Sequence, residues 1–119
     1  MVLSYDEDRT FAALSPSRFG AGGSSRLDWR GAEALRSSPA FDGAQLRKTL
    51  LELAGPDEPA VVFWGNPAVP STAVEAGLVA RHADAVLADC YECRVHLVDS
   101  EVLIEFRDGE GSTAGRVPR

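Results

Sequence analysis

The sequence has few of the features that mark membrane, secreted or nucleic-acid-binding proteins. Its longest uninterrupted apolar run, residues 60–64, spans five residues, whereas a helix needs about 20 to cross a bilayer. Residues 1–8 turn acidic at once and lack the basic-then-apolar order of a signal peptide. Lys and Arg total 12 against 18 Asp and Glu, a net charge of −6, while nucleic-acid binders cluster basic residues. We therefore expect a cytoplasmic protein without direct membrane or nucleic-acid binding.

Cysteine and histidine are scarce, and the chain does not need a metal ion to fold. A chain of 119 residues buries about 65% of the surface that its unfolded form exposes. A zinc site would need all of Cys90, Cys93, His82 and His96. Cys93 and His96 fall on opposite faces of a predicted strand, and His82 lies on the preceding helix. Cys90 and Cys93 also follow a helix C-terminus, which disfavours a redox-active thiolate. We expect inert cysteines, no metal and no cofactor.

No catalytic motif stands out. The glycine-rich segment 20–26 lacks the Gly-Lys-Ser/Thr of a phosphate-binding loop, because the single lysine is Lys48. A histidine base with an orienting carboxylate needs a nucleophile beside it, and no serine motif accompanies either candidate pair. Those pairs are His82 with Asp84 and His96 with Asp99. We expect a non-catalytic protein and predict no catalytic residue.

Two helices are predicted in the first half of the chain. Residues 28–37 have a capping Asp28 and end before Pro39. Residues 42–54 begin at a capping Asp42 and end at the glycine and proline that follow. Three leucines of the second helix lie on one face and predict a buried stripe: Leu46, Leu50 and Leu53.

A third helix is predicted over residues 71–89. Thr72 and Glu75 have the spacing of a capping box at its N-terminus. The helical period predicts an inner, buried face formed by Val74, Leu78, His82 and Val86, with Val79 and Leu87 alongside.

Three strands are predicted. Residues 60–65 form a short continuous apolar run, which is typical of a central strand buried on both faces. Residues 91–98 and 101–107 alternate between apolar and polar side chains, which predicts a hairpin with a turn at Asp99 and Ser100. The polar positions of this hairpin are expected to face solvent.

The predicted order of elements is helix, helix, strand, helix, strand, strand. The strand–helix–strand unit favours a right-handed parallel crossover, with the last strand added antiparallel. We expect an α+β fold: a small mixed sheet of about three strands covered by helices. Residues 1–107 would form a single domain and the Gly-, Ser- and Pro-rich residues 108–119 a flexible tail. Residues 1–14 carry no assignable pattern.

Acidic residues concentrate in the second half of the chain. Residues 84–110 hold eight acids and two bases, a net charge of −6, whereas residues 1–59 hold nine acids and seven bases. Such a face either keeps the protein soluble or steers it onto a basic partner. The partner-binding candidates are the acids Asp89, Glu92, Asp99, Glu101 and Glu105, with Tyr91 as an aromatic anchor.

In size, charge and layout the chain resembles the immunity proteins of bacterial polymorphic-toxin systems. The resemblance covers the order of helix, residues 61–64, helix and hairpin, together with the acidic stretch 84–110. It implies a small cytoplasmic α+β protein that binds and neutralises a cognate basic toxin, with a nuclease as the natural candidate. Two alternatives remain open: an adaptor or secretion chaperone, and a small enzyme or ligand-binding domain with an unrecognised site.

Overall fold

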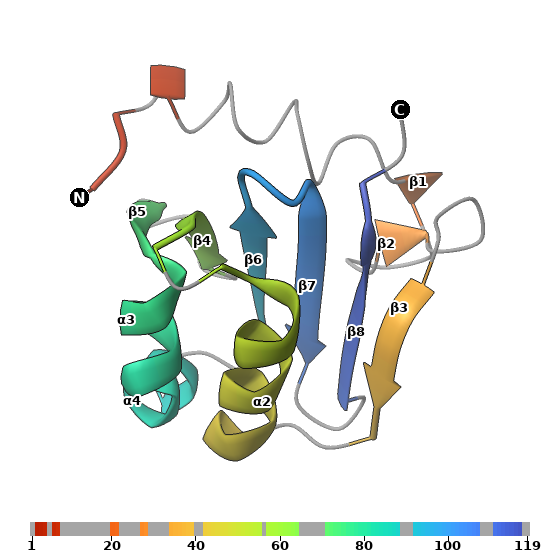
Figure 1. Cartoon of the computed structure of the whole chain (residues 1–119). Coiled ribbons are helices and arrows are strands. Elements are labelled where there is room, and N and C mark those ends of the chain that lie inside the picture. The colour runs from red at the N-terminus through yellow and green to blue at the C-terminus, as the bar shows by residue number, and fades with distance from the viewer. Residues whose placement is uncertain are drawn as a thin grey trace.

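The chain folds into a six-stranded antiparallel sheet with three helices over the part that the structure describes (Figure 1). In this computed structural model the described residues are 2–4, 6–7, 20–21, 27–28, 34–39, 42–55, 57–64, 71–88, 92–107 and 111–117. The strand order is β3-β8-β7-β6-β4-β5. A separate short hairpin pairs β1 (Gly20–Ala21) with β2 (Leu27–Asp28). The predicted α+β class is confirmed, but the expected count of about three strands is too low.

The three strands predicted from sequence form the centre of the sheet. They are β4 (Pro59–Trp64), β6 (Glu92–Leu97) and β7 (Val102–Arg107). The predicted hairpin of β6 and β7 is also confirmed: opposite residues pair in register from Glu92 with Arg107 to Leu97 with Val102. The expected alternation of buried and solvent-facing positions is wrong in β7, where residues 102–106 are all buried. One face of these strands, including Val95, Ile104 and Phe106, packs in the core against the helices.

Helix α2 (Gly43–Leu53) matches the predicted helix 42–54 closely. Asp42 caps it, because its carboxylate accepts a hydrogen bond of 2.7 Å from the Gln45 N–H. Leu46 and Leu50 are fully buried against the sheet, which is where the apolar stripe of an amphipathic helix belongs.

The predicted helix 28–37 is wrong. Asp28 ends β2, and β3 (Ala34–Ser38) forms an edge strand of the main sheet paired with β8. A short segment has little intrinsic preference to keep it helical, and pairing with β8 satisfies its backbone groups instead. Leu35 still packs against the core, but from a strand.

The predicted helix 71–89 is shorter and broken. Thr72–Glu75 forms β5, and the helical part divides into α3 (Ala76–Arg81) and α4 (Ala83–Ala88). Glu75 is the N-cap residue of α3 and makes no side-chain cap bond, so the capping-box interpretation is also wrong. The break at His82 changes which side chains face the core: Leu78 and His82, which were predicted to be buried, are exposed. The buried residues are Ala76, Val79, Ala80, Ala83 and Leu87.

Strand β5 also changes the predicted crossover. Both β5 and β6 run antiparallel to β4, one on each side of it. The parallel relationship predicted between residues 60–65 and 91–98 is therefore wrong. The extra strand reverses the chain once more before α3, so the helical connection joins β5 to β6 rather than β4 to β6.

Residues 111–116, which the sequence placed in a flexible tail, form β8 (Gly111–Arg116) between β7 and β3. Its small side chains carry no apolar alternation, so only pairing with two neighbouring strands makes it a strand. Gly111 has a φ of +83°, and a β-carbon there would lie 2.7 Å from Pro39 Cα. Only glycine fits this position without strain.

The three described helices lie together on one face of the sheet (Figure 1). The opposite face is also buried: Val61, His96, Leu103 and Glu105 are at most 5% exposed. The N-terminal Val2 bridges to Thr72 at the β5 edge. No helix in the described part of the chain is long and apolar enough to span a membrane.

Candidate protein-binding surface

Glu58 joins three segments at one end of the sheet. Its carboxylate accepts hydrogen bonds from the Ser100 N–H at 2.6 Å and the Ser100 hydroxyl at 2.8 Å. It also accepts one from the Gly55 N–H at 3.1 Å, while its backbone oxygen accepts one from the Ala76 N–H at 2.8 Å. Glu58 therefore fixes the α2–β4 loop, the β5–α3 junction and the β6–β7 turn relative to one another.

The Glu58 carboxylate stays ionised in this setting. Burial acts to raise its pKa, but hydrogen bonds from the Ser100 hydroxyl and from the backbone N–H groups of Ser100, Gly55 and Asp99 together lower the pKa below its ordinary value. Donors from the protein replace the water that burial removes. Glu58 thus adds a fixed negative charge beneath this end of the molecule.

The β6–β7 turn spans four residues, 98–101, rather than the two predicted. The Val98 N–H donates to the Pro59 oxygen at 3.0 Å, which ties the turn to the start of β4. Glu101 has a φ of +55°, in the left-handed region. Ser100 points inward to Glu58, while Asp99 and Glu101 are exposed on either side of it.

Four segments that carry exposed carboxylates converge at this end of the sheet. They are the last turn of α2, the α2–β4 loop, the end of β5 and the β6–β7 turn, all within a few residues of the contacts that Glu58 makes. Two described bases lie near these carboxylates: Arg116 is opposite Val102 at the same end of the sheet, and Lys48 precedes Glu52 by one turn of α2. We call these carboxylates the acidic end: Glu52, Asp57, Glu75, Asp99 and Glu101.

The structure divides the partner-binding residues predicted from the sequence. Asp99 and Glu101 belong to the acidic end, whereas Glu92 lies at the far end of β6, opposite Arg107. β6 runs from Glu92 to Leu97, so its length of about 17 Å separates Glu92 from the turn that carries Asp99. Asp89 and Tyr91 lie outside the described residues.

Glu105 does not lie on a solvated face. It is 5% exposed, and Arg94 Nε lies 3.1 Å from its carboxylate oxygen across the β6–β7 pair. An acid on a polar strand position looks the same in sequence whether the sheet is covered on one side or both. The expectation of a solvent-facing hairpin surface is therefore wrong at Glu105.

The histidines and cysteines are spread over the fold. Cys93 and His96 lie on opposite faces of the sheet, as the strand alternation predicted: Cys93 is in the core under the helices. His96 is buried as well, so the expectation that this polar strand position faces solvent is wrong. Burial lowers the pKa of His96, against the opposing charges of Glu101 and Glu58. His82 is exposed between α3 and α4, and Cys90 lies outside the described residues. The described residues hold no group of three potential metal ligands.

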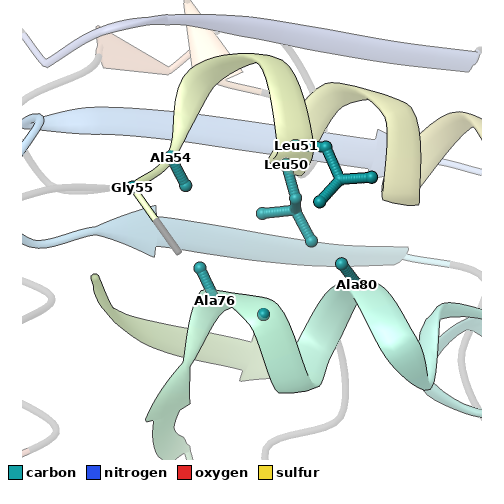
Figure 2. Close-up of a pocket in the computed structure, with 7 residues that line it drawn as sticks. Leu50, Leu51, Ala54, Gly55, Ala76 and Ala80 are labelled. Atoms are coloured by element: carbon teal, nitrogen blue, oxygen red, sulfur yellow. The ribbon is translucent and has the colours of Figure 1, made fainter. Parts of the chain in front are cut away.

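An apolar groove runs between α2 and α3, beside the acidic end (Figure 2). Its volume is about 20 Å³, little more than one water molecule needs and far below the roughly 300–1,000 Å³ of small-molecule sites. Leu51 at its rim is 67% exposed.

Sequence patterns alone would not have located this surface. Glu58 and Ser100 are 42 positions apart, and Glu52, Asp57 and Glu75 precede the acidic stretch 84–110. An acid directly before a buried apolar strand was the one local signal for Glu58. No protein-family model matches the chain, and no curated protein shows significant sequence similarity to it.

Proposed function

We propose that this protein is a non-catalytic immunity protein that binds and neutralises a basic toxin through the acidic end. The observation that carries the proposal is the gathering of five exposed carboxylates from four separate segments, held in place by Glu58. The hydrogen bonds of Glu58 fix the end of α2, the α2–β4 loop and the β6–β7 turn relative to one another, so the charged residues on these segments would be preorganised for a partner.

Electrostatics favour a basic partner. The chain has a net charge of −6, and charges within about 10 Å act together at moderate salt before screening removes their effect. Such a surface accelerates encounter with an oppositely charged protein and rejects acidic ones. A nuclease toxin fits this requirement, because its substrate cleft must be basic to hold nucleic acid.

The two alternatives receive less support from the described residues. An exposed apolar stripe on α2 would favour an adaptor or secretion chaperone, but Leu46 and Leu50 are buried. A small-molecule site would need a larger pocket than the groove described above. The acidic end is consequently the feature that best distinguishes among these functions.

The proposal is tested by a growth-rescue experiment. The tagged protein is used to capture its partner at low and at high salt, and the partner is then expressed alone in a host cell. We expect a basic partner that arrests growth, is released at high salt and is neutralised when this protein is co-expressed. A partner that is harmless when expressed alone would contradict the immunity function.

A charge-matched pair of variants links rescue to the acidic end. Asp57→Asn with Asp99→Asn removes two charges there. Asp42→Ser with Asp84→Asn removes two charges near the opposite end of α2, and serine still caps that helix. Loss of rescue in the first double variant, with rescue kept in the second, is expected. Equal rescue by both variants would contradict the assignment of the surface.

A further inference from the structure

Strand β5 (Thr72–Glu75) is an edge of the main sheet, where β4 is its only neighbour in the described strand order. An edge strand carries backbone N–H and C=O groups on its outer side, and these can pair with an added strand. The Pro59 oxygen faces β6, because it accepts a hydrogen bond of 3.0 Å from the Val98 N–H. Glu75 lies opposite Pro59, so its backbone groups turn away from β4. The same alternation turns outward the backbone groups of Ser71 and Ala73.

The N-terminal residues of the chain already pair with this edge (Figure 1). The Leu3 N–H donates a hydrogen bond of 2.8 Å to the Ser71 oxygen, and Val2 forms an antiparallel bridge with Thr72. Leu3 is 5% exposed and Val2 is 63% exposed. The edge therefore accepts a strand and buries an apolar side chain at the position of Leu3. We call residues 2–3 the N-terminal strap.

The N-terminal strap is short and runs away from the acidic end. Because its pairing with β5 is antiparallel, the chain passes from Val2 to Leu3 in the direction away from Glu75. At Ser4 the chain turns into a capping box: the Ser4 N–H donates to the Glu7 carboxylate at 3.0 Å, and the Glu7 N–H donates to the Ser4 hydroxyl at 3.2 Å. The capping box ends the strap, so few hydrogen bonds hold it and a longer strand can replace it.

We propose that the β5 edge receives a strand of the basic partner, which displaces the N-terminal strap. This inference rests on the proposed function, because Glu75 at the end of β5 belongs to the acidic end. In the register that the strap defines, the position opposite Glu75 precedes the position of Leu3 by four residues. The partner strand carries Lys or Arg at the first position and an apolar residue at the second, both on the same side of the strand.

Charge selects this occupant over a second copy of the chain. Strand β5 has the sequence Thr-Ala-Val-Glu and carries no base, so pairing of two β5 strands would leave Glu75 without a cation opposite it. A basic strand supplies that cation, and cross-strand pairs of opposite charge stabilise a sheet. Backbone hydrogen bonds to the edge supply affinity, while the pockets and charges for side chains supply specificity.

Two substitutions of Glu75 separate its backbone N–H from its carboxylate. Glu75→Pro removes both, whereas Glu75→Ala removes the carboxylate alone. Proline fits this position, because Glu75 has a φ of −66° and follows an extended residue, Val74. Both variants should melt at similar temperatures, since the N–H that proline removes faces away from β4. Calorimetry with the purified partner captured as described above should show that Glu75→Pro binds at least about tenfold more weakly than Glu75→Ala.

Hydrogen exchange and a leucine variant test displacement of the strap. In the wild-type complex, NMR should show slower exchange at the Glu75 N–H and faster exchange at the Leu3 N–H than in the free protein. Leu3→Ala weakens the strap and should raise the affinity for the partner about threefold or more, because less of the edge is occupied beforehand. Leu51→Ala makes the same change at an exposed leucine of α2 and should leave the affinity unchanged.

The outcomes distinguish this inference from the proposed function. Equal affinity of Glu75→Pro and Glu75→Ala would overturn the strand addition. Slower exchange at both Leu3 and Glu75, or unchanged affinity in Leu3→Ala, would overturn the displacement of the strap. Each of these results leaves the proposed function standing if the partner is basic and toxic. A captured partner that is acidic, or harmless when expressed alone, would contradict the proposed function itself.

Discussion

The Glu58 carboxylate accepts two hydrogen bonds from Ser100, one from its backbone N–H and one from its hydroxyl, across 42 positions of sequence. This double contact holds the β6–β7 turn against the α2–β4 loop, so it determines the shape of the acidic end. Hydrogen bonds to a charged acceptor are the stronger class in proteins. The stability of the fold and the geometry of the proposed binding surface therefore depend on the same pair.

Glu58→Gln should destabilise the protein by about 2 kcal/mol. In this buried site, a neutral amide oxygen would accept the hydrogen bonds that the charged carboxylate now accepts. Ser100→Ala should cost about 1 kcal/mol, since the backbone N–H still donates. The double variant should cost less than the sum of the two by more than about 0.5 kcal/mol. Chemical denaturation measures all three free energies of unfolding. Strictly additive effects would contradict direct coupling between the two side chains.

Stability should fall as the pH drops below about 6.5, partly through His96. Burial lowers its pKa in the folded state below the ordinary value of 6.5, so the unfolded chain binds the proton more readily. The stability it contributes is complete above pH 6.5 and is lost as the pH falls toward the folded pKa. His96→Gln should flatten this part of the curve of unfolding free energy against pH.

Glu58 also makes stability fall as the pH drops, but at lower pH, because its pKa in the folded state is lowered from an ordinary value of 4.5. Its contribution is present above pH 4.5 and is lost below it. Identical curves for wild type and His96→Gln would contradict the buried position of His96.

Glu105 should behave as a structural residue rather than a binding residue. Glu105→Lys would place two cations together where Arg94 now pairs with the carboxylate, and breaking a buried ion pair costs about 3–5 kcal/mol. Asp99→Lys, on the exposed turn, should change stability by less than about 0.5 kcal/mol. Thermal unfolding compares the two variants. Equal melting temperatures would mean that Glu105 is not buried as the structure places it.

Gly111→Ala tests whether residues 111–116 belong to the sheet. The φ of +83° and the Ser38 and Pro39 backbone leave no room for a β-carbon, so we expect a loss of about 2 kcal/mol or more. Gly55→Ala is the control, because its β-carbon would lie 4.0 Å from Glu58 Cβ, an ordinary contact. Similar melting temperatures for Gly111→Ala and wild type would agree with a flexible tail and contradict β8.

The elements that were predicted correctly carry their own hydrophobic pattern. Residues 60–64, the hairpin alternation and the leucine stripe of α2 each determine a buried face locally. Strand β8 has no such pattern, and β3 and β5 are short segments whose structure depends on strands distant in sequence. The sequence did not reveal β5, and this produced the wrong prediction for β4 and β6. Because β5 reverses the chain before the helices, β6 runs antiparallel to β4 instead of parallel to it.

The candidate surface was predictable only in part, for a related reason. Asp99 and Glu101 stand out because they follow one another around a predicted turn. Their partners Glu52, Asp57 and Glu75 come from other segments, and only the fold brings them to the same end. Burial of Glu105 depends on what covers the second face of the sheet, which strand alternation cannot indicate.

The most direct test of the account measures the affinity of the purified partner by isothermal titration calorimetry, at about 0.05 M and 0.5 M salt. Wild type should bind one partner molecule and lose at least about tenfold in affinity at high salt. At low salt, Asp57→Asn with Asp99→Asn should bind about tenfold more weakly, and Asp42→Ser with Asp84→Asn within about twofold of wild type. Affinity that is independent of salt, or equal in the two double variants, would contradict recognition through the acidic end.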